Sequence, residues 1–122
     1  MEGQVWVALV KGLIVARVRG EPTEALLREC QERVLEIART NEAATVHPVL
    51  YDALEMESPS VNVAISQRQL DEALQDVRLR RAIVVPNTRL AYLARLAFGE
   101  GDYRVFYEDL AAAITWLSQP HA

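Results

Sequence analysis

Apolar and polar residues repeat with different periods along the chain, and each change of period marks an expected element. Two runs rich in β-branched residues, Val5–Val10 and Leu13–Val18, flank the pair Lys11-Gly12. Two such runs separated by a short turn favour an antiparallel hairpin. The second run alternates with period two and carries arginine on one face, which indicates that this face reaches water at the far end of the strand.

The period changes to that of a helix after residues 20–23, which stop the strand. Thr23 is the expected N-cap, Glu24 complements the positive end of the helix dipole, and Thr40-Asn41 ends the helix. A short strand over Val49–Asp52 follows and is expected to end in a carboxylate. The inward face of the helix should consist of Leu26, Leu27, Cys30, Val34, Ile37 and Ala38.

The segment Ala53–Ser66 is irregular, because its apolar residues do not settle on one helical face. We expect a loop there, with at most a short first turn. Ser58 precedes a proline and has the chemistry of a helix cap. A helix is predicted from Gln67 to Asp76, where apolar residues recur at helical spacing, with Ser66 and Gln69 as its capping box.

The last third of the chain, Arg80–Leu117, predicts strand, helix, strand and helix in close succession. Ala82–Val85 is a continuous apolar run, typical of a central strand covered on both faces. A helix over Thr88–Phe98 follows, capped by Asn87 or by its own first residue. Tyr103–Phe106 is the last expected strand. The final helix should face inward with Leu110, Ala113, Ile114 and Leu117.

The expected order of elements is therefore ββαβαβαβα. Alternating strands and helices predict a mostly parallel sheet with right-handed crossovers, and the first hairpin makes the sheet mixed. The predicted fold class is α/β, with a mixed sheet of about five strands and about four helices. A length of 122 residues fits one domain over residues 1–122.

Composition narrows the class of protein. With 51% apolar and 25% charged residues, the chain can build a core without disulfides or metal. A net charge of −4 disfavours nucleic-acid binding. Because no stretch of about 18 uncharged apolar residues exists, we expect no membrane span. The single cysteine excludes an intrachain disulfide and is compatible with a reducing compartment, so we expect a cytoplasmic protein. Arg78, Arg80 and Arg81 form a basic cluster, either a solvated cap or a site for phosphate or an acidic partner.

Residues with reactive or metal-binding side chains are few and scattered. His47, in an expected loop, and His121, in the tail, have no metal-binding spacing with each other or with Cys30. Cys30 lies on the inward face of the first helix and is expected to act as a small hydrophobe. The sequence has no motif of a nucleotide-binding loop, a serine hydrolase or a zinc protease. We therefore expect no cofactor, no metal and no enzymatic activity.

The last third also carries a family likeness. The strand Arg81–Val85, the helix segment Ala91–Ala94, and the ending Val105-Phe106 followed by Ala112–Leu117 resemble the SpoIIAA-like branch of the STAS superfamily (sulfate transporter and anti-sigma factor antagonist domains). The strand Leu50–Asp52 fits the same layout. The resemblance implies a STAS-like, non-enzymatic regulatory or ligand-sensing domain from a bacterium.

The same resemblance implies a candidate switch or ligand loop. In anti-sigma factor antagonists, a strand ending in Asp leads to an Asp-Ser-Ser-Gly loop whose serine is phosphorylated by a kinase partner. Asp52 matches the strand-end Asp, and Ser58 and Ser60 fall near the phosphoserine loop. The sequence departs from the pattern there, because Glu57 replaces the second Asp, Pro59 separates the serines and no Gly follows. For Ser58, a purely structural role as a cap stays open.

The helix Thr88–Phe98 has more apolar surface than one sheet covers. Tyr92, Leu93 and Leu96 are therefore a candidate partner surface or pocket wall, and the alternative is a broad core face. A partner would be another protein or a second copy, joined through this helix or an exposed edge strand. The branch also resembles CRAL-TRIO lipid-binding domains in fold. This likeness implies a small apolar ligand, in a pocket expected under Ala53–Ser66.

Overall fold

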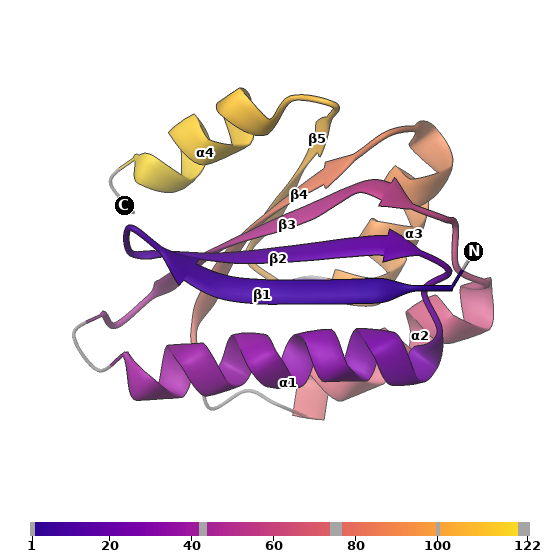
Figure 1. The fold of residues 1–122 in the computed structure, drawn as a ribbon, viewed down its shortest axis with the longest axis horizontal. Helices are drawn as coiled ribbons and strands as arrows, with labels where there is room; N and C mark the ends of the chain where they lie inside the picture. Colours follow the sequence, from indigo (N-terminus) through magenta and orange to yellow (C-terminus); the bar gives the residue numbers. More distant parts are fainter. Residues whose placement is uncertain (1, 42–43, 74–76, 100, 120–122) are drawn as a thin grey trace.

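Five strands form one mixed sheet and four helices pack on it in a computed structural model of the chain (Figure 1). The structure describes residues 2–41, 44–73, 77–99 and 101–119. This architecture confirms the predicted order and the α/β class. The elements are β1 (Gln4–Val10), β2 (Leu13–Gly20), α1 (Glu24–Thr40), β3 (His47–Met56), α2 (Val61–Ala73), β4 (Leu79–Val85), α3 (Thr88–Phe98), β5 (Tyr103–Tyr107) and α4 (Leu110–Ser118).

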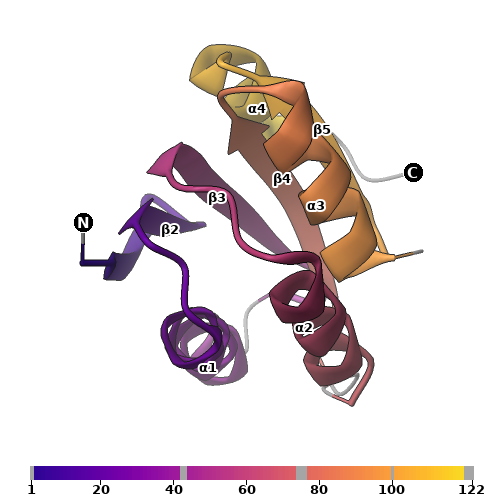
Figure 2. The same ribbon diagram turned by 90° about the vertical axis from the view of Figure 1, so that its right-hand side faces the viewer.

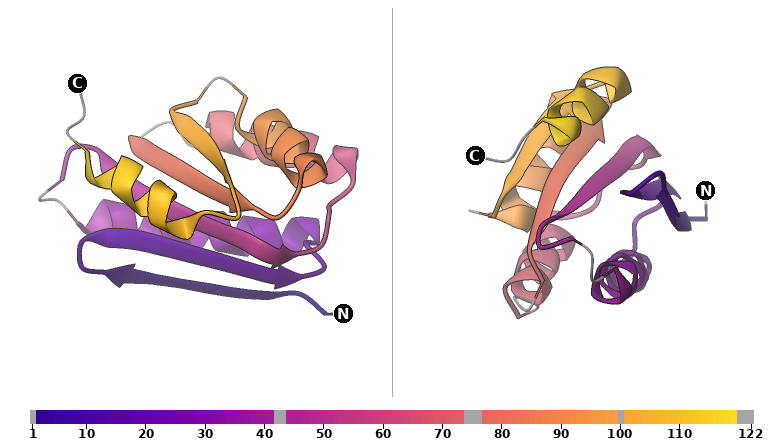
Figure 3. Two further views of the ribbon diagram at one scale, coloured as in Figure 1. Left: turned by 90° about the horizontal axis from the view of Figure 1, so that it is seen from above. Right: turned by 90° about the vertical axis from the view of Figure 1, so that its left-hand side faces the viewer.

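The sheet has the strand order β1-β2-β3-β4-β5, so both outer strands have one free edge within it. β1 and β2 are antiparallel, and the other neighbouring pairs are parallel. Helices α1, α2 and α3 lie on one side of the sheet and α4 lies on the other (Figures 2 and 3). Because α4 packs on β3, β4 and β5, it leaves β1 uncovered on that side.

The first hairpin forms as its pattern predicts. Lys11 and Gly12 both have positive φ, 51° and 83°, which the two central residues of a type I′ turn require. That turn matches the right-handed twist of the two strands it joins. Ile14, Ala16 and Val18 then alternate inward along β2, so the hairpin closes one end of the main core.

The predicted cap positions of α1 and α3 are confirmed. Thr23 Oγ1 accepts a hydrogen bond of 3.1 Å from Leu26 N, and Asn87 Oδ1 accepts one of 2.9 Å from Leu90 N. Each bond satisfies a backbone N–H that has no partner within its helix. Gly99 has a φ of 58° at the end of α3, in the left-handed region that glycine adopts without strain.

Strand β3 is much longer than predicted. It continues past Asp52 to Met56, so the expected loop over 53–56 is wrong. The pairing with β2 shifts by one residue between Asp52 and Glu55, which marks a β-bulge. A bulge breaks the period-two alternation, and this break concealed the strand. His47, expected in a loop, is the buried first residue of β3.

Helix α2 begins earlier than predicted. Ser60 is its cap, because its Oγ accepts a hydrogen bond of 3.2 Å from Val63 N. Ser66 and Gln69 lie inside the helix, so the predicted capping box is wrong. The predicted last residues, 74–76, fall outside the described part of the chain.

The continuous apolar strand β4 is covered on both faces, as predicted. Ala82 and Val84 pack toward α4, whereas Ile83 and Val85 join the core under α3. In α4, Ala113 and Leu117 are buried, but Ile114 is 43% exposed and its predicted inward position is wrong. The short helix contacts the sheet along a narrow stripe, and Ile114 lies beside that stripe.

Candidate functional site

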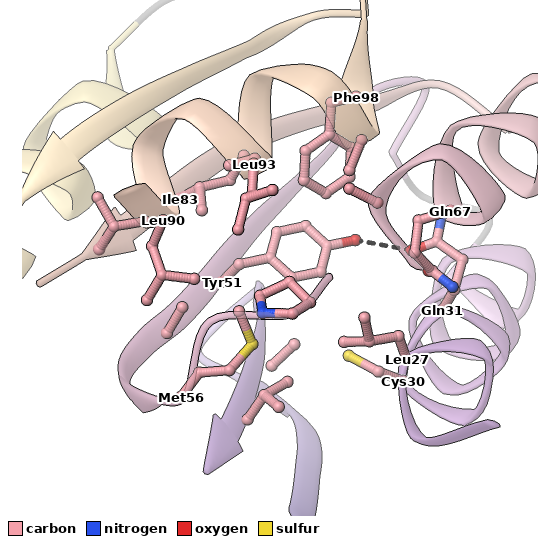
Figure 4. Close-up of a pocket in the computed structure, with 18 of the residues that line it drawn as sticks. Leu27, Cys30, Gln31, Tyr51, Met56, Gln67, Ile83, Leu90, Leu93 and Phe98 are labelled. Carbon is pink, nitrogen blue, oxygen red and sulfur yellow. Dashed lines mark hydrogen bonds between the residues drawn. The ribbon is translucent and has the colours of Figure 1, made fainter. Parts of the chain in front are cut away.

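An apolar cavity of about 100 Å³ lies between the sheet and the helices α1, α2 and α3 (Figure 4). It reaches the carboxyl ends of the parallel strands, where open α/β sheets commonly bind ligands. The sheet contributes Ala16, Tyr51 and Ile83, α1 contributes Leu27, Cys30 and Gln31, and α3 contributes Leu90, Leu93 and Phe98. Met56, Pro59, Ala64 and Gln67 complete much of the remaining wall.

Helix α2 forms the outer wall of this cavity. It packs mainly against α1 and α3 rather than directly on the sheet. Among its residues whose side chains the structure describes, Ala64 alone is fully buried, whereas Val61 and Ile65 are exposed. An element with so few buried apolar contacts is attached weakly to the rest of a fold. The cavity therefore lies under a helix that buries few apolar side chains.

A chain of hydrogen bonds crosses one end of the cavity and joins four elements. The Tyr51 hydroxyl on β3 donates to Gln31 Oε1 on α1 at 3.0 Å. Gln31 Nε2 donates to Asp71 Oδ1 on α2 at 3.4 Å, and Arg81 Nη1 on β4 donates to the same oxygen at 2.6 Å. Because burial raises the pKa of Tyr51 far above its ordinary value, its hydroxyl stays protonated as a donor.

The arginine cluster predicted from the sequence is divided by the sheet. Arg81 is buried, pairs with Asp71, and stacks on Phe98 with its guanidinium carbon 4.5 Å from the ring centroid. Arg80 stacks instead on Trp116 of α4, at 3.8 Å. Neighbouring residues of a strand point to opposite faces. A solvated cap is therefore the wrong interpretation for Arg81, and Arg78 is the exposed member of the three.

Asp52 lies within β3 rather than at its end. Its Oδ2 accepts from Arg17 Nε at 3.2 Å, and its Oδ1 accepts from Leu54 N at 3.1 Å, which holds the bulge. Both carboxylate oxygens therefore have partners inside the sheet. Ser58 and Ser60 are exposed in the loop before α2, whereas Asp52 is buried. Among the contacts described, none joins either serine to Asp52, although Asp52 and Pro59 line the same cavity.

The three candidate residues on α3 differ in their burial. Leu93 is buried and lines the cavity, Leu96 is half-buried, and Tyr92 is 53% exposed. Leu93 thus belongs to the pocket wall, and Tyr92 belongs to the outer surface.

Cys30 lines the cavity without the properties of a nucleophile. Burial raises the pKa of its thiol to about 12, so the reactive thiolate is scarce at neutral pH. Within the described ranges, no three His, Cys, Asp or Glu residues are grouped to hold a metal ion. No helix in the same ranges is long and apolar enough to cross a membrane.

Sequence reasoning missed Gln31 and Asp71, which form the polar end of the cavity. Gln31 directly follows the inward Cys30, so a polar residue on an apolar helix face was the available signal. For Asp71 the sequence carries no such signal, because its partners lie 40 residues earlier and 10 residues later in the chain.

No protein-family profile and no curated protein sequence matches the chain. Two solved structures are similar over nearly its whole length. An anti-sigma factor antagonist from Mycobacterium paratuberculosis has a TM-score of 0.64 at 14% identity, covering 97% of this chain and 96% of that one. An uncharacterised protein with a SpoIIAA-like fold from Shewanella loihica has a TM-score of 0.63 at 19% identity, covering 94% and 93%. The chain therefore has the SpoIIAA-like, STAS-type fold that its last third resembles.

Proposed function

We propose that this chain is a non-enzymatic regulatory domain that binds a protein partner at the start of α2. The observation that carries the proposal is the exposed apolar pair Val61 and Ile65 beside the exposed serines Ser58 and Ser60, which together we call the α2 surface. A fold neighbour named as an anti-sigma factor antagonist supports a protein as the partner.

The α2 surface combines features that suit regulated binding. Val61 and Ile65 are four residues apart and share one helix face, so they form a continuous apolar contact area. Ser60 caps the helix. A phosphoryl group on this serine would meet the free N–H groups and the positive end of the helix dipole. Phosphorylation would therefore change the charge beside the apolar pair while leaving the helix start stabilised.

A photo-crosslinking amino acid at position 65 tests the proposal in the intact chain. The matched control is position 114, because Ile65 and Ile114 are 40% and 43% exposed but belong to α2 and α4, two helices on opposite sides of the sheet. We expect position 65 to capture a specific protein. With that protein purified, Ile65→Asp should weaken binding at least about tenfold and Ile114→Asp should not. Capture of the same proteins from both positions, or equal effects of both variants, would contradict the proposal.

The cavity supports a second candidate function, the binding of a small and mainly apolar molecule. An apolar cavity of about 150 Å³ is known to stay dry and to accept benzene or xenon. The cavity here has about 100 Å³, so it suits a ligand of a few heavy atoms. A lipid chain would fit only if α2 moved outward. Native mass spectrometry of gently purified protein should then show added mass, and bare protein alone would remove this candidate.

A further inference from the structure

Strand β1 is an edge strand without the usual protection against pairing. Its seven residues, QVWVALV, include no charge, proline or glycine, and Trp6, Leu9 and Val10 are 48%, 47% and 42% exposed. The opposite edge, β5, has five residues and carries the exposed Arg104. Folded proteins block free edges with short strands, charges, prolines or bulges, because an open edge recruits another strand. β5 is protected in this way and β1 is not.

The turn after β1 determines which backbone groups face outward. A two-residue hairpin turn closes on a hydrogen-bonded pair, here Val10 and Leu13. Hydrogen-bonded and non-hydrogen-bonded pairs alternate along an antiparallel ladder. The N–H and C=O groups of Val5, Val7 and Leu9 therefore point away from β2, along the outer edge of the sheet.

We propose that a second copy of the chain covers this edge, through antiparallel pairing of the two β1 strands about a twofold axis at Val7. In this register Val7 pairs with itself, and Val5 pairs with Leu9 of the second copy, so every outward backbone group finds a partner. Trp6 then lies opposite Ala8 of the second copy. That contact sets a large side chain against a small one, on the face that α4 leaves open.

Charge at the two ends of β1 favours a second copy as the occupant. Glu2 precedes the strand and Lys11, the single lysine of the chain, follows it, and both are exposed. Antiparallel pairing about Val7 brings Lys11 opposite Gly3 of the second copy, next to Glu2, at both ends of the new ladder. Parallel pairing would instead set like charges together. The strand is thus complementary in charge to its own antiparallel image.

Sedimentation equilibrium of the full chain over a range of concentrations measures this association. We expect a mass of two chains at high concentration and a shift to one chain on dilution. Leu9→Lys introduces a charge on the proposed edge and should weaken association at least about tenfold, equivalent to about 1.4 kcal/mol. Tyr107→Lys on β5 is the matched control, since Leu9 and Tyr107 are 47% and 48% exposed. Circular dichroism checks that both variants fold.

A charge exchange tests the register. Glu2→Lys and Lys11→Glu should each weaken the dimer, and the double variant should restore it, because opposite charges face each other again. A single chain at all concentrations would overturn the proposal, as would dissociation by Tyr107→Lys instead of Leu9→Lys. The outcome is independent of the proposed function, since Ile65→Asp alters the α2 surface and should leave the dimer mass unchanged.

Discussion

The Tyr51 hydroxyl donates a hydrogen bond of 3.0 Å to Gln31 Oε1, and this contact ties the central strand β3 to helix α1 inside the core. Tyr51→Phe would remove the donor and leave a buried amide oxygen without it. We expect a loss of about 1–3 kcal/mol in the free energy of unfolding, measured by urea denaturation. Tyr92→Phe changes an exposed tyrosine and should have little effect. Equal stability of the two variants would show that the contact contributes nothing.

The ion pair between Asp71 and Arg81 should matter far more than a surface pair on the same helix. Asp71→Ala would leave the buried Arg81 cation without its partner, at a cost of about 3–5 kcal/mol. Glu72→Ala breaks the exposed pair with Arg68 and should cost no more than about 1 kcal/mol. Denaturation of both variants under identical conditions compares them. If both substitutions lowered the free energy of unfolding by similar amounts, the Asp71–Arg81 pair would contribute no more than an exposed pair.

Filling the cavity should stabilise the protein against urea denaturation. Ala64→Leu adds apolar volume at the cavity wall, and we expect a gain of about 1 kcal/mol. Ala113→Leu is the control, because Ala113 is fully buried in the other core and the added carbons should cost about 1–3 kcal/mol. We therefore expect the free energy of unfolding to rise in Ala64→Leu and to fall in Ala113→Leu. A loss in both variants would indicate that the space beside Ala64 is already filled.

Stability should fall with rising pH above about 9. The pKa of Cys30 is raised from 9.0 to about 12, so between these values the unfolded chain loses a proton that the folded chain keeps. The unfolded state then binds fewer protons and gains stability relative to the folded state. Tyr51, whose pKa is also raised by burial, acts in the same direction. Cys30→Val should flatten the dependence of unfolding free energy on pH over this window, and an unchanged slope would show that the thiol does not contribute.

The two serines before α2 should differ in their effect on stability. Ser60→Ala removes the cap and should cost about 1 kcal/mol, whereas Ser60→Asp keeps a capping oxygen and should cost less. Ser58→Ala should have no measurable effect. Thermal unfolding of the three variants ranks them. If Ser58→Ala lowered the stability more than Ser60→Ala, Ser58 would be the cap of α2, as the sequence alone indicates.

Local chemistry made much of the fold predictable. Ala82–Val85 is apolar because both faces of β4 are covered, and the cap at Thr23 is determined within one helical turn. The end of β3 was not predictable in this way. The bulge after Asp52 depends on pairing with Arg17, a residue 35 positions earlier, so no local pattern reveals it.

The candidate site was less accessible to sequence reasoning. Leu93 was a candidate for a partner surface or a pocket wall because its helix is apolar over a wide arc, and in the structure it lines the cavity. The polar chain from Tyr51 to Arg81 is assembled from four separate elements, and only folding brings its members within hydrogen-bond distance. The start of helix α2 could not be predicted from the hydrophobic pattern. Val61 and Ile65 face solvent, where an amphipathic helix normally has polar residues.

The attachment of α2 is uneven along its length. Near its carboxyl end, Asp71 is held by Gln31 and Arg81, whereas at its start Ser60 bonds only to the helix's own backbone among the contacts described. The described side-chain bonds thus fasten α2 to α1 and β4 near its carboxyl end only. A charge placed on Ser60 would act at the other end of the helix, next to Pro59 and close to Ala64, which both line the cavity.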